Sequence, residues 1–179
     1  MQRLYKLTNE QGFTRNRTPW QIGIRHEARG VGNVLCTDGV LHAYSDPLVA
    51  ILMNPLHANF LSPRMYLVLG DVAASDGIKV GSKFQKCVAR LDVPAPSVEV
   101  RVIFGILCGL SVFYNEPWRQ WAFAWLSGKD RSRNSASYSA IAADAIKSVD
   151  FSRLADLAFQ IAGDGYQAVE ARGDMPWTS

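Results

Sequence analysis

The spacing of hydrophobic and polar positions changes at the Pro-rich segment PAPS, residues 94–97. Before it, short stretches of alternating or β-branched residues are separated by turn formers, which is typical of strands. We expect strands over 3–8, 22–28, 40–45 and 63–72, and one or two more over 78–93. The pattern after the segment is helical. It therefore predicts an α+β protein, in which a small, mostly antiparallel sheet precedes a bundle of three to four helices.

One helix is predicted inside the sheet-bearing half. Asp46 and Pro47 follow the strand at 40–45. Aspartate accepts hydrogen bonds from the free amides of a first helical turn, and proline is tolerated at the first helical position. The helix should therefore begin at Pro47. Pro55 disfavours a helical conformation at Asn54, so we expect a stop or a kink there, about two turns later.

The second half predicts helices over 97–163. Ser97 is the expected N-cap of an almost wholly apolar helix, although its β-branched start makes a strand the alternative there. Asn115 and Gly128 bracket the next helix. Two more helices are expected over 131–148 and 150–163, and residues 164–179 should form a partly mobile tail. We expect residues 1–94 and 97–163 to pack as one globular unit.

Composition allows a folded core and a mild basic excess. The 179 residues are 48% hydrophobic and 20% charged, which is ordinary for a globular protein. The net charge of +3 is weaker than that of a dedicated nucleic-acid binder. The excess is uneven: residues 1–94 hold 11 Lys and Arg against 7 Asp and Glu, whereas residues 95–179 hold 8 against 9.

The three cysteines, Cys36, Cys87 and Cys108, are widely spaced and form no CxxC motif. This spacing predicts neither a disulfide framework nor a zinc site, and Cys87 and Cys108 should be core residues. The longest apolar run, residues 102–113, is too short to span a bilayer. We therefore expect a soluble, cytoplasmic protein with no membrane contact, no metal and no cofactor.

His42, Tyr44 and Asp46 are the candidate catalytic residues, because they share one face of the predicted strand. A histidine held by an aspartate beside a tyrosine is a workable acid–base group. We favour a structural role, in which Asp46 caps the helix and the other two pack with their polar tips outward. His57 should be a helix-end residue rather than a partner of His42.

The segment from residue 12 to residue 29 is the candidate partner-binding region. It holds the arginines Arg15, Arg17, Arg25 and Arg29, together with Trp20. Arginine and an aromatic residue can bind phosphates and stack on bases, and arginine equally pairs with the carboxylates of a protein. The alternative is a solvated loop with Trp20 in the core.

A second aromatic pattern lies in the helical half. Trp118, Trp121 and Trp125 recur at helical spacing and form one stripe. We expect this stripe to be core, packed against the preceding apolar helix. An exposed interaction face is the alternative, since tryptophan is favoured at interface hot spots.

Several segments together resemble a family of phage-encoded domains of unknown function. They are LYKLT, LCTDGVLHAYSDPLVAILMNPLHANF, DGIKVG and WAFAWLSGKDRS, within residues 3–135. The resemblance implies a phage or prophage product in a bacterial cytoplasm, and it brings no catalytic residue with it. Relatives continue into long Ala-rich helices, whereas this chain has a shorter and more varied C-terminal part.

These observations predict an accessory protein that binds and modulates or inhibits a host or phage protein complex. The resemblance makes a bacterial defence system, inhibited in the manner of an anti-CRISPR protein, one such target. One alternative is a nucleotide-using enzyme similar to an ADP-ribosyltransferase, with His42 and Tyr44 near its pocket. Nucleic-acid binding is the weaker alternative.

Overall fold

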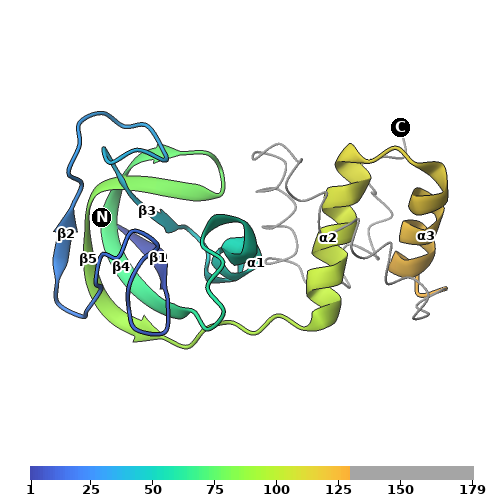
Figure 1. Cartoon of the computed structure of the whole chain (residues 1–179), viewed down its shortest axis with the longest axis horizontal. Helices are drawn as coiled ribbons and strands as arrows, with labels where there is room; N and C mark the ends of the chain where they lie inside the picture. The colour runs from blue at the N-terminus through green and yellow to red at the C-terminus, as the bar shows by residue number, and fades with distance from the viewer. Residues whose placement is uncertain (130–179) are drawn as a thin grey trace. The chain divides into compact units, whose positions relative to one another are not determined.

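The structure, a computed structural model, describes residues 1–129 and divides the chain into two compact units (Figure 1). Unit 1 is Met1–Ala95, and unit 2 is Pro96–Ser179. The helices predicted over 131–148 and 150–163, and the tail at 164–179, lie outside the described residues. Within those residues the fold is α+β, with five antiparallel strands and one inserted helix followed by two further helices.

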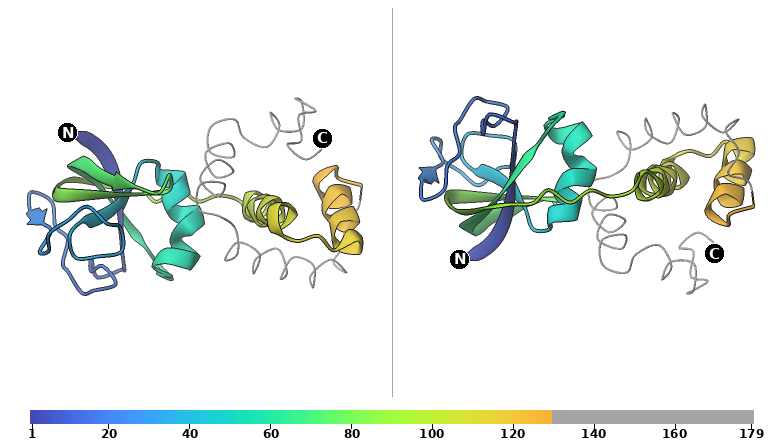
Figure 2. Two further views of the ribbon diagram at one scale, coloured as in Figure 1. Left: turned by 90° about the horizontal axis from the view of Figure 1, so that it is seen from above. Right: turned by 90° about the horizontal axis from the view of Figure 1, so that it is seen from below.

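Unit 1 holds the predicted sheet. Its strands are β1 (Gln2–Thr8), β2 (Arg25–Glu27), β3 (Leu41–Tyr44), β4 (Arg64–Ser75) and β5 (Lys79–Leu91). The helix α1 (Pro47–His57) lies between β3 and β4 in sequence. It packs against β1 and β3, on one side of the sheet (Figure 2). The inserted helix and its start at Pro47 are therefore confirmed.

The sheet curls so that four strands pair in a closed cycle. Its order is β2-β5-β3-β1-β4, and β4 also pairs with β5. Register shifts along the β4–β5 pair indicate bulges, which bend strands and increase their twist. At Gly70 a Cβ atom would lie 2.7 Å from the carbonyl oxygen of Phe84, so only glycine allows this close approach. The curvature gives the unit a concave interior in place of a flat sheet.

One face of the strands forms a compact apolar cluster. The cluster consists of Leu4, Trp20, Ala43, Tyr66, Val68, Val80 and Cys87. Cys87 is fully buried, as its apolar neighbours predicted. Trp20 comes from the loop after β1 and is only 2% exposed, so the Arg-rich segment is anchored in the core through this side chain.

Of the stop or kink predicted at Asn54, the stop does not occur. The helix α1 continues through Pro55 to His57. The side chain of Asn54 donates to the carbonyl of Phe60 at 2.8 Å and accepts from the Phe60 amide at 3.1 Å. The backbone carbonyl of Asn54 also accepts from the Ala58 amide at 3.0 Å. These bonds offset the one that Pro55 removes and carry the helix one turn further.

Two predicted strands differ in extent from those observed. The strand expected over 22–28 is reduced to β2, because Gly23 adopts a φ of 88° and the Ile24 amide bonds back to the Gln21 carbonyl in a turn. The segment 78–93 forms a single long strand, β5, after the turn at Asp76 and Gly77. There, Oδ1 of Asp76 accepts from the amides of Ile78 and Lys79.

Unit 2 begins with two helices whose ends follow the predicted signals. The helix α2 (Val98–Val112) has Ser97 as its N-cap, so the strand alternative is wrong. The helix α3 (Glu116–Leu126) is capped by Asn115 and followed by Gly128 with a φ of 73°. No helix among residues 1–129 is long and apolar enough to cross a membrane.

The tryptophan stripe forms the core of the described part of unit 2. Trp118, Trp121 and Trp125 are all buried, which confirms the core prediction. At Gly109 on α2, a Cβ atom would lie 2.4 Å from the Trp118 ring. The glycine therefore lets the largest side chain of α3 reach the backbone of α2. Cys108 beside it is also fully buried, as predicted.

Candidate functional site

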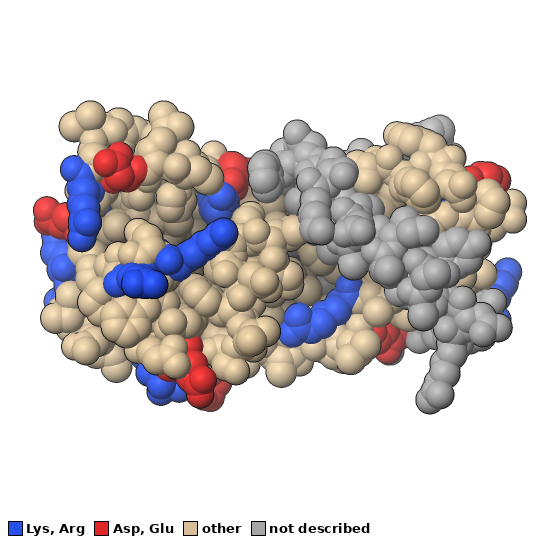
Figure 3. Space-filling model, viewed as in Figure 1, with Lys and Arg blue, Asp and Glu red and all other residues tan. Residues whose placement is uncertain are grey.

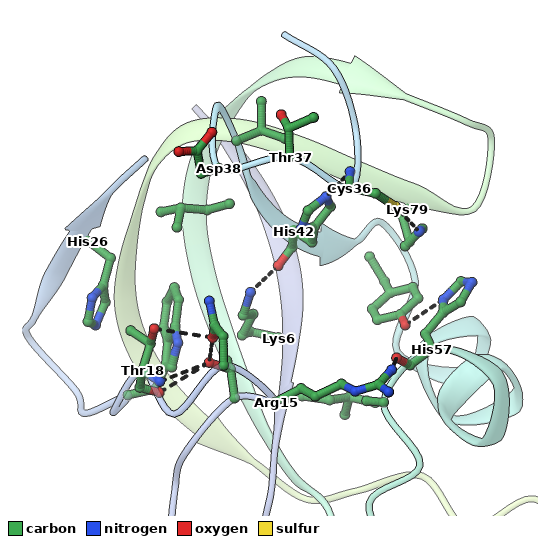
Figure 4. A pocket seen from close by; sticks show the side chains of 18 of the residues that line it. Lys6, Arg15, Thr18, His26, Cys36, Thr37, Asp38, His42, His57 and Lys79 are labelled. Carbon is green, nitrogen blue, oxygen red and sulfur yellow. Dashed lines mark hydrogen bonds between the residues drawn. The ribbon is translucent and has the colours of Figure 1, made fainter. Parts of the chain in front are cut away.

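Unit 1 encloses a cavity of about 930 Å³, a volume within the range of small-molecule sites (Figure 4). Its walls come from β1, the loop after β1, β2, the segment between β2 and β3, β3, the end of α1 and the start of β5. The curled sheet therefore brings together side chains that lie far apart in the sequence. All three histidines of the chain line this cavity.

The candidate partner-binding residues divide into two groups. Arg15, Trp20 and Arg29 line the cavity, whereas Arg17 and Arg25 do not. The Arg25 guanidinium lies 3.8 Å from the centroid of the Phe84 ring and 3.1 Å from a carboxylate oxygen of Glu27. These contacts keep Arg25 on the outer surface of β2, where it is exposed.

The three candidate catalytic residues also separate. Oδ1 of Asp46 accepts from the amides of Leu48 at 2.7 Å and Val49 at 2.9 Å, so Asp46 caps α1 as expected. It does not line the cavity. His42 and Tyr44 do line it, and each makes a hydrogen bond with a residue that the sequence had not paired with it.

Lys6 lies at the centre of the cavity wall (Figure 4). Its ammonium group donates to the carbonyl of His42 and lies 4.8 Å from the centroid of the Trp20 ring. It forms no ion pair with a carboxylate among residues 1–129. Desolvation by the surrounding protein lowers the pKa of Lys6 from 10.5 to about 7.

Trp20 and His26 line the cavity beside Lys6. Their ring centroids are 4.3 Å apart. Burial and the neighbouring charge of Lys6 lower the pKa of His26 below 6.5, so this imidazole is neutral at pH 7. In the part of the chain that the structure describes, Nε1 of Trp20 and Nε2 of His26 have no hydrogen-bond partner. A buried polar atom without a partner costs about 1–3 kcal/mol, so a ligand that supplied hydrogen-bond partners to these two atoms would offset this cost.

His42 holds the opposite wall in place. Its Nε2 accepts from the backbone amide of Cys36 at 2.8 Å, so the ring proton lies on Nδ1. Burial, followed by the charges of Lys6 and Lys79, lowers the pKa of His42. The amine of Lys79 in turn donates to Sγ of Cys36 at 3.2 Å. Cys36 adopts a φ of 64°, and these two contacts fix it at the edge of the cavity.

A lysine on β5 also makes hydrogen bonds to the segment between β2 and β3. The amine of Lys83 donates to the carbonyl oxygens of Gly32 and Gly39. At Gly39 a Cβ atom would lie 2.5 Å from the backbone carbonyl oxygen of Val31, and at Gly30 it would meet the side-chain carboxylate of Asp38. This wall of the cavity is therefore held by specific bonds in spite of its length.

Tyr44 and His57 form a hydrogen-bonded pair at the end of α1. The Tyr44 hydroxyl lies 2.9 Å from Nδ1 of His57. Burial, aided by Asp76, raises the pKa of Tyr44, and burial and Lys79 lower the pKa of His57 to about 4. At neutral pH the tyrosine therefore donates and the neutral imidazole carries its proton on Nε2. His57 is a helix-end residue, as expected, and also the partner of Tyr44.

The cavity carries a positive excess. Four of its lining residues are basic, namely Lys6, Arg15, Arg29 and Lys79, against the two acidic residues Glu27 and Asp38. On the face of unit 1 seen in Figure 3, basic side chains lie in separate groups interspersed with acidic ones and broad uncharged regions.

Sequence reasoning missed Lys6, His26, His57 and Lys79 as members of one site. They come from β1, β2, α1 and β5, so no local motif joins them. The available signal was Lys6 itself, a charged residue between Leu4 and Leu7 in a half-buried strand. No group of three metal-ligating side chains occurs among residues 1–129.

Comparisons of the chain with protein-family models, with curated proteins and with solved structures found no match.

Proposed function

We propose that unit 1 binds a small anionic molecule in its cavity. The observation that carries this proposal is Lys6, a lysine that faces the cavity without a carboxylate partner in the described chain. A buried amine without a counter-ion is costly, and an anionic ligand would supply the missing charge. Arg15 and Arg29, which also line the cavity, add two guanidinium groups suited to a phosphate or a carboxylate.

Binding to a panel of anions tests this proposal. The panel contains inorganic phosphate, sugar phosphates, nucleotides and NAD, the last because a nucleotide-using enzyme is an alternative prediction from the sequence. Calorimetric titration of the full chain should find at least one binder. The Lys6→Met variant should bind it about tenfold more weakly, the worth of one charge-assisted hydrogen bond.

Lys86→Met is the matched control, because Lys86 is exposed on β5 and does not line the cavity. Its affinity for the same anion should equal that of the wild type. Equal weakening in both variants would show a general charge effect and remove the proposal.

The second candidate is the accessory protein that binds a host or phage protein complex. Exposed apolar side chains just before and just after the edge strand β2 in the sequence favour this second candidate. Ile22, Ile24, Val31 and Val34 are all exposed, with Val31 at 96%. β2 pairs with β5 and with no other described strand. Arg17 and Arg25 lie in the same part of the chain, so the surface suits an acidic partner with apolar residues.

A pull-down from bacterial lysate at two salt concentrations tests this second candidate. The double variant Arg17→Glu and Arg25→Glu should lose the captured protein, because it reverses two charges of the proposed surface. Both arginines lie outside the cavity. Ligand binding in the cavity should be unchanged in that variant. Retention of the same captured protein by the double variant would rule out this surface.

A further inference from the structure

We infer that Lys6 is a carbonyl-reactive lysine, which forms an imine with an anionic aldehyde or ketone bound in the cavity. This inference rests on the proposed anion binding and specifies both the ligand class and the reacting atom. A phosphate or a carboxylate on the ligand would bind the basic wall, and a carbonyl carbon would reach Nζ of Lys6.

The surroundings of Lys6 meet the requirements of such chemistry. The amine donates one hydrogen bond to the His42 carbonyl, which directs it, and the Trp20 ring lies 4.8 Å away on another side. No carboxylate among residues 1–129 forms an ion pair with the amine and holds it in its charged form. The cavity of about 930 Å³ provides access from the remaining direction.

The protonation state agrees with this geometry. Desolvation lowers the pKa of Lys6 to about 7. Near neutral pH about half of the Lys6 amines therefore carry a free electron pair, whereas an ordinary lysine is almost fully charged. Burial of this kind is a general way in which proteins activate lysine as a nucleophile.

The reaction balances without an oxidant or a reductant. The electron pair of Nζ forms a bond to the carbonyl carbon, and the carbonyl oxygen takes up a proton to give a carbinolamine. The carbon–oxygen bond then breaks as the carbon–nitrogen double bond forms. The two hydrogens of the amine leave with the oxygen as water, and the imine remains.

Reductive trapping of the full chain tests the inference with two probes. Pyridoxal 5′-phosphate carries an aldehyde and a phosphate, and glyoxylate is a smaller aldehyde with a carboxylate. Borohydride reduces an imine to a stable secondary amine, and peptide mass mapping then locates it. At pH 7 we expect Lys6 to be trapped at least about tenfold faster than the exposed Lys86, because about half of the Lys6 amines are uncharged.

Pyridoxine 5′-phosphate separates failure of this inference from failure of the proposed function. It is the alcohol of the first probe, so it can bind but cannot form an imine. If this alcohol competes with the aldehyde and so slows the trapping of Lys6, both proposals are supported. Binding of the alcohol without trapping at Lys6 would overturn the imine alone, whereas neither binding nor trapping would overturn both.

The site of trapping is mapped in the wild-type chain, so the result does not depend on the folding of a variant. Lys6→Arg supplies an independent check, because arginine keeps a positive charge and forms no imine under these conditions. In this variant the fast trapping should disappear, and only the slow trapping of the surface lysines should remain. Equal trapping across all lysines of the wild type would contradict the inference.

Discussion

The hydroxyl of Tyr44, at the end of β3, lies 2.9 Å from Nδ1 of His57, the last residue of α1. This bond links the end of the strand that precedes the inserted helix to the last residue of that helix. Arg15 adds a longer contact, in which Nη1 lies 3.5 Å from the His57 carbonyl. The end of the helix is thus connected to a strand and to the loop after β1.

Tyr44→Phe should therefore destabilise unit 1 by about 1–2 kcal/mol, because Nδ1 of His57 loses its donor while it stays largely buried. Urea denaturation of both chains measures the difference. An unchanged free energy of unfolding would show that the bond contributes nothing.

The same histidine predicts a pH dependence of stability. The pKa of His57 is lowered from 6.5 to about 4, so the unfolded chain binds more protons than the folded chain between these values. The free energy of unfolding should fall as pH decreases from about 6.5 to about 4. His57→Gln should reduce this slope, and an identical slope in both chains would contradict the assigned pKa.

Lys6→Met should lose ligand affinity and yet stabilise the folded chain. At pH 6 the wild type holds a charged amine in a desolvated position, and methionine removes that cost. We expect a gain of about 1 kcal/mol in the free energy of unfolding. A loss of stability together with a loss of binding would indicate that Lys6 is a structural residue.

Anion binding and imine formation should depend on pH in opposite directions. Inorganic sulfate keeps its charge between pH 6 and 8, whereas the Lys6 amine loses its own near its pKa of about 7. Sulfate affinity should therefore fall over this range, while trapping of Lys6 should become faster. Parallel changes of the two would contradict the role given to this amine.

Gly109→Ala should destabilise unit 2, because the new Cβ would lie 2.4 Å from the Trp118 ring. Overpacking of this kind costs about 1–3 kcal/mol. Tryptophan fluorescence during denaturation measures the effect, and anion binding in unit 1 serves as the control that should not change. Wild-type stability in this variant would mean that α2 and α3 pack differently.

Signals within a few residues were sufficient to predict the elements. Ser97 and Asn115 marked helix starts, and Asp46 with Pro47 marked the start of α1, because caps act on adjacent amides. The choice between a stop and a kink at Asn54 could not be made, since it depends on bonds between Asn54 and Phe60 that no propensity encodes.

The cavity could not be predicted in the same way. Lys6 and Lys79 reach it from β1 and β5, which flank β3 in the sheet, so their effect on His42 depends on pairings between distant segments. The sequence did identify His42, Tyr44 and Trp20 as unusual residues. It could not show that they line one cavity, because register and bulges decide which strand faces meet.

The most direct test of the account is the indole N–H resonance of Trp20, followed during titration of the labelled full chain with the binding anion. Trp20→Phe assigns that resonance. The account predicts that this signal and the Cys36 amide shift and saturate together, and that both need about tenfold more anion in Lys6→Met. Saturable binding that leaves both signals unmoved and shifts only residues around Arg17 and Arg25 would contradict it.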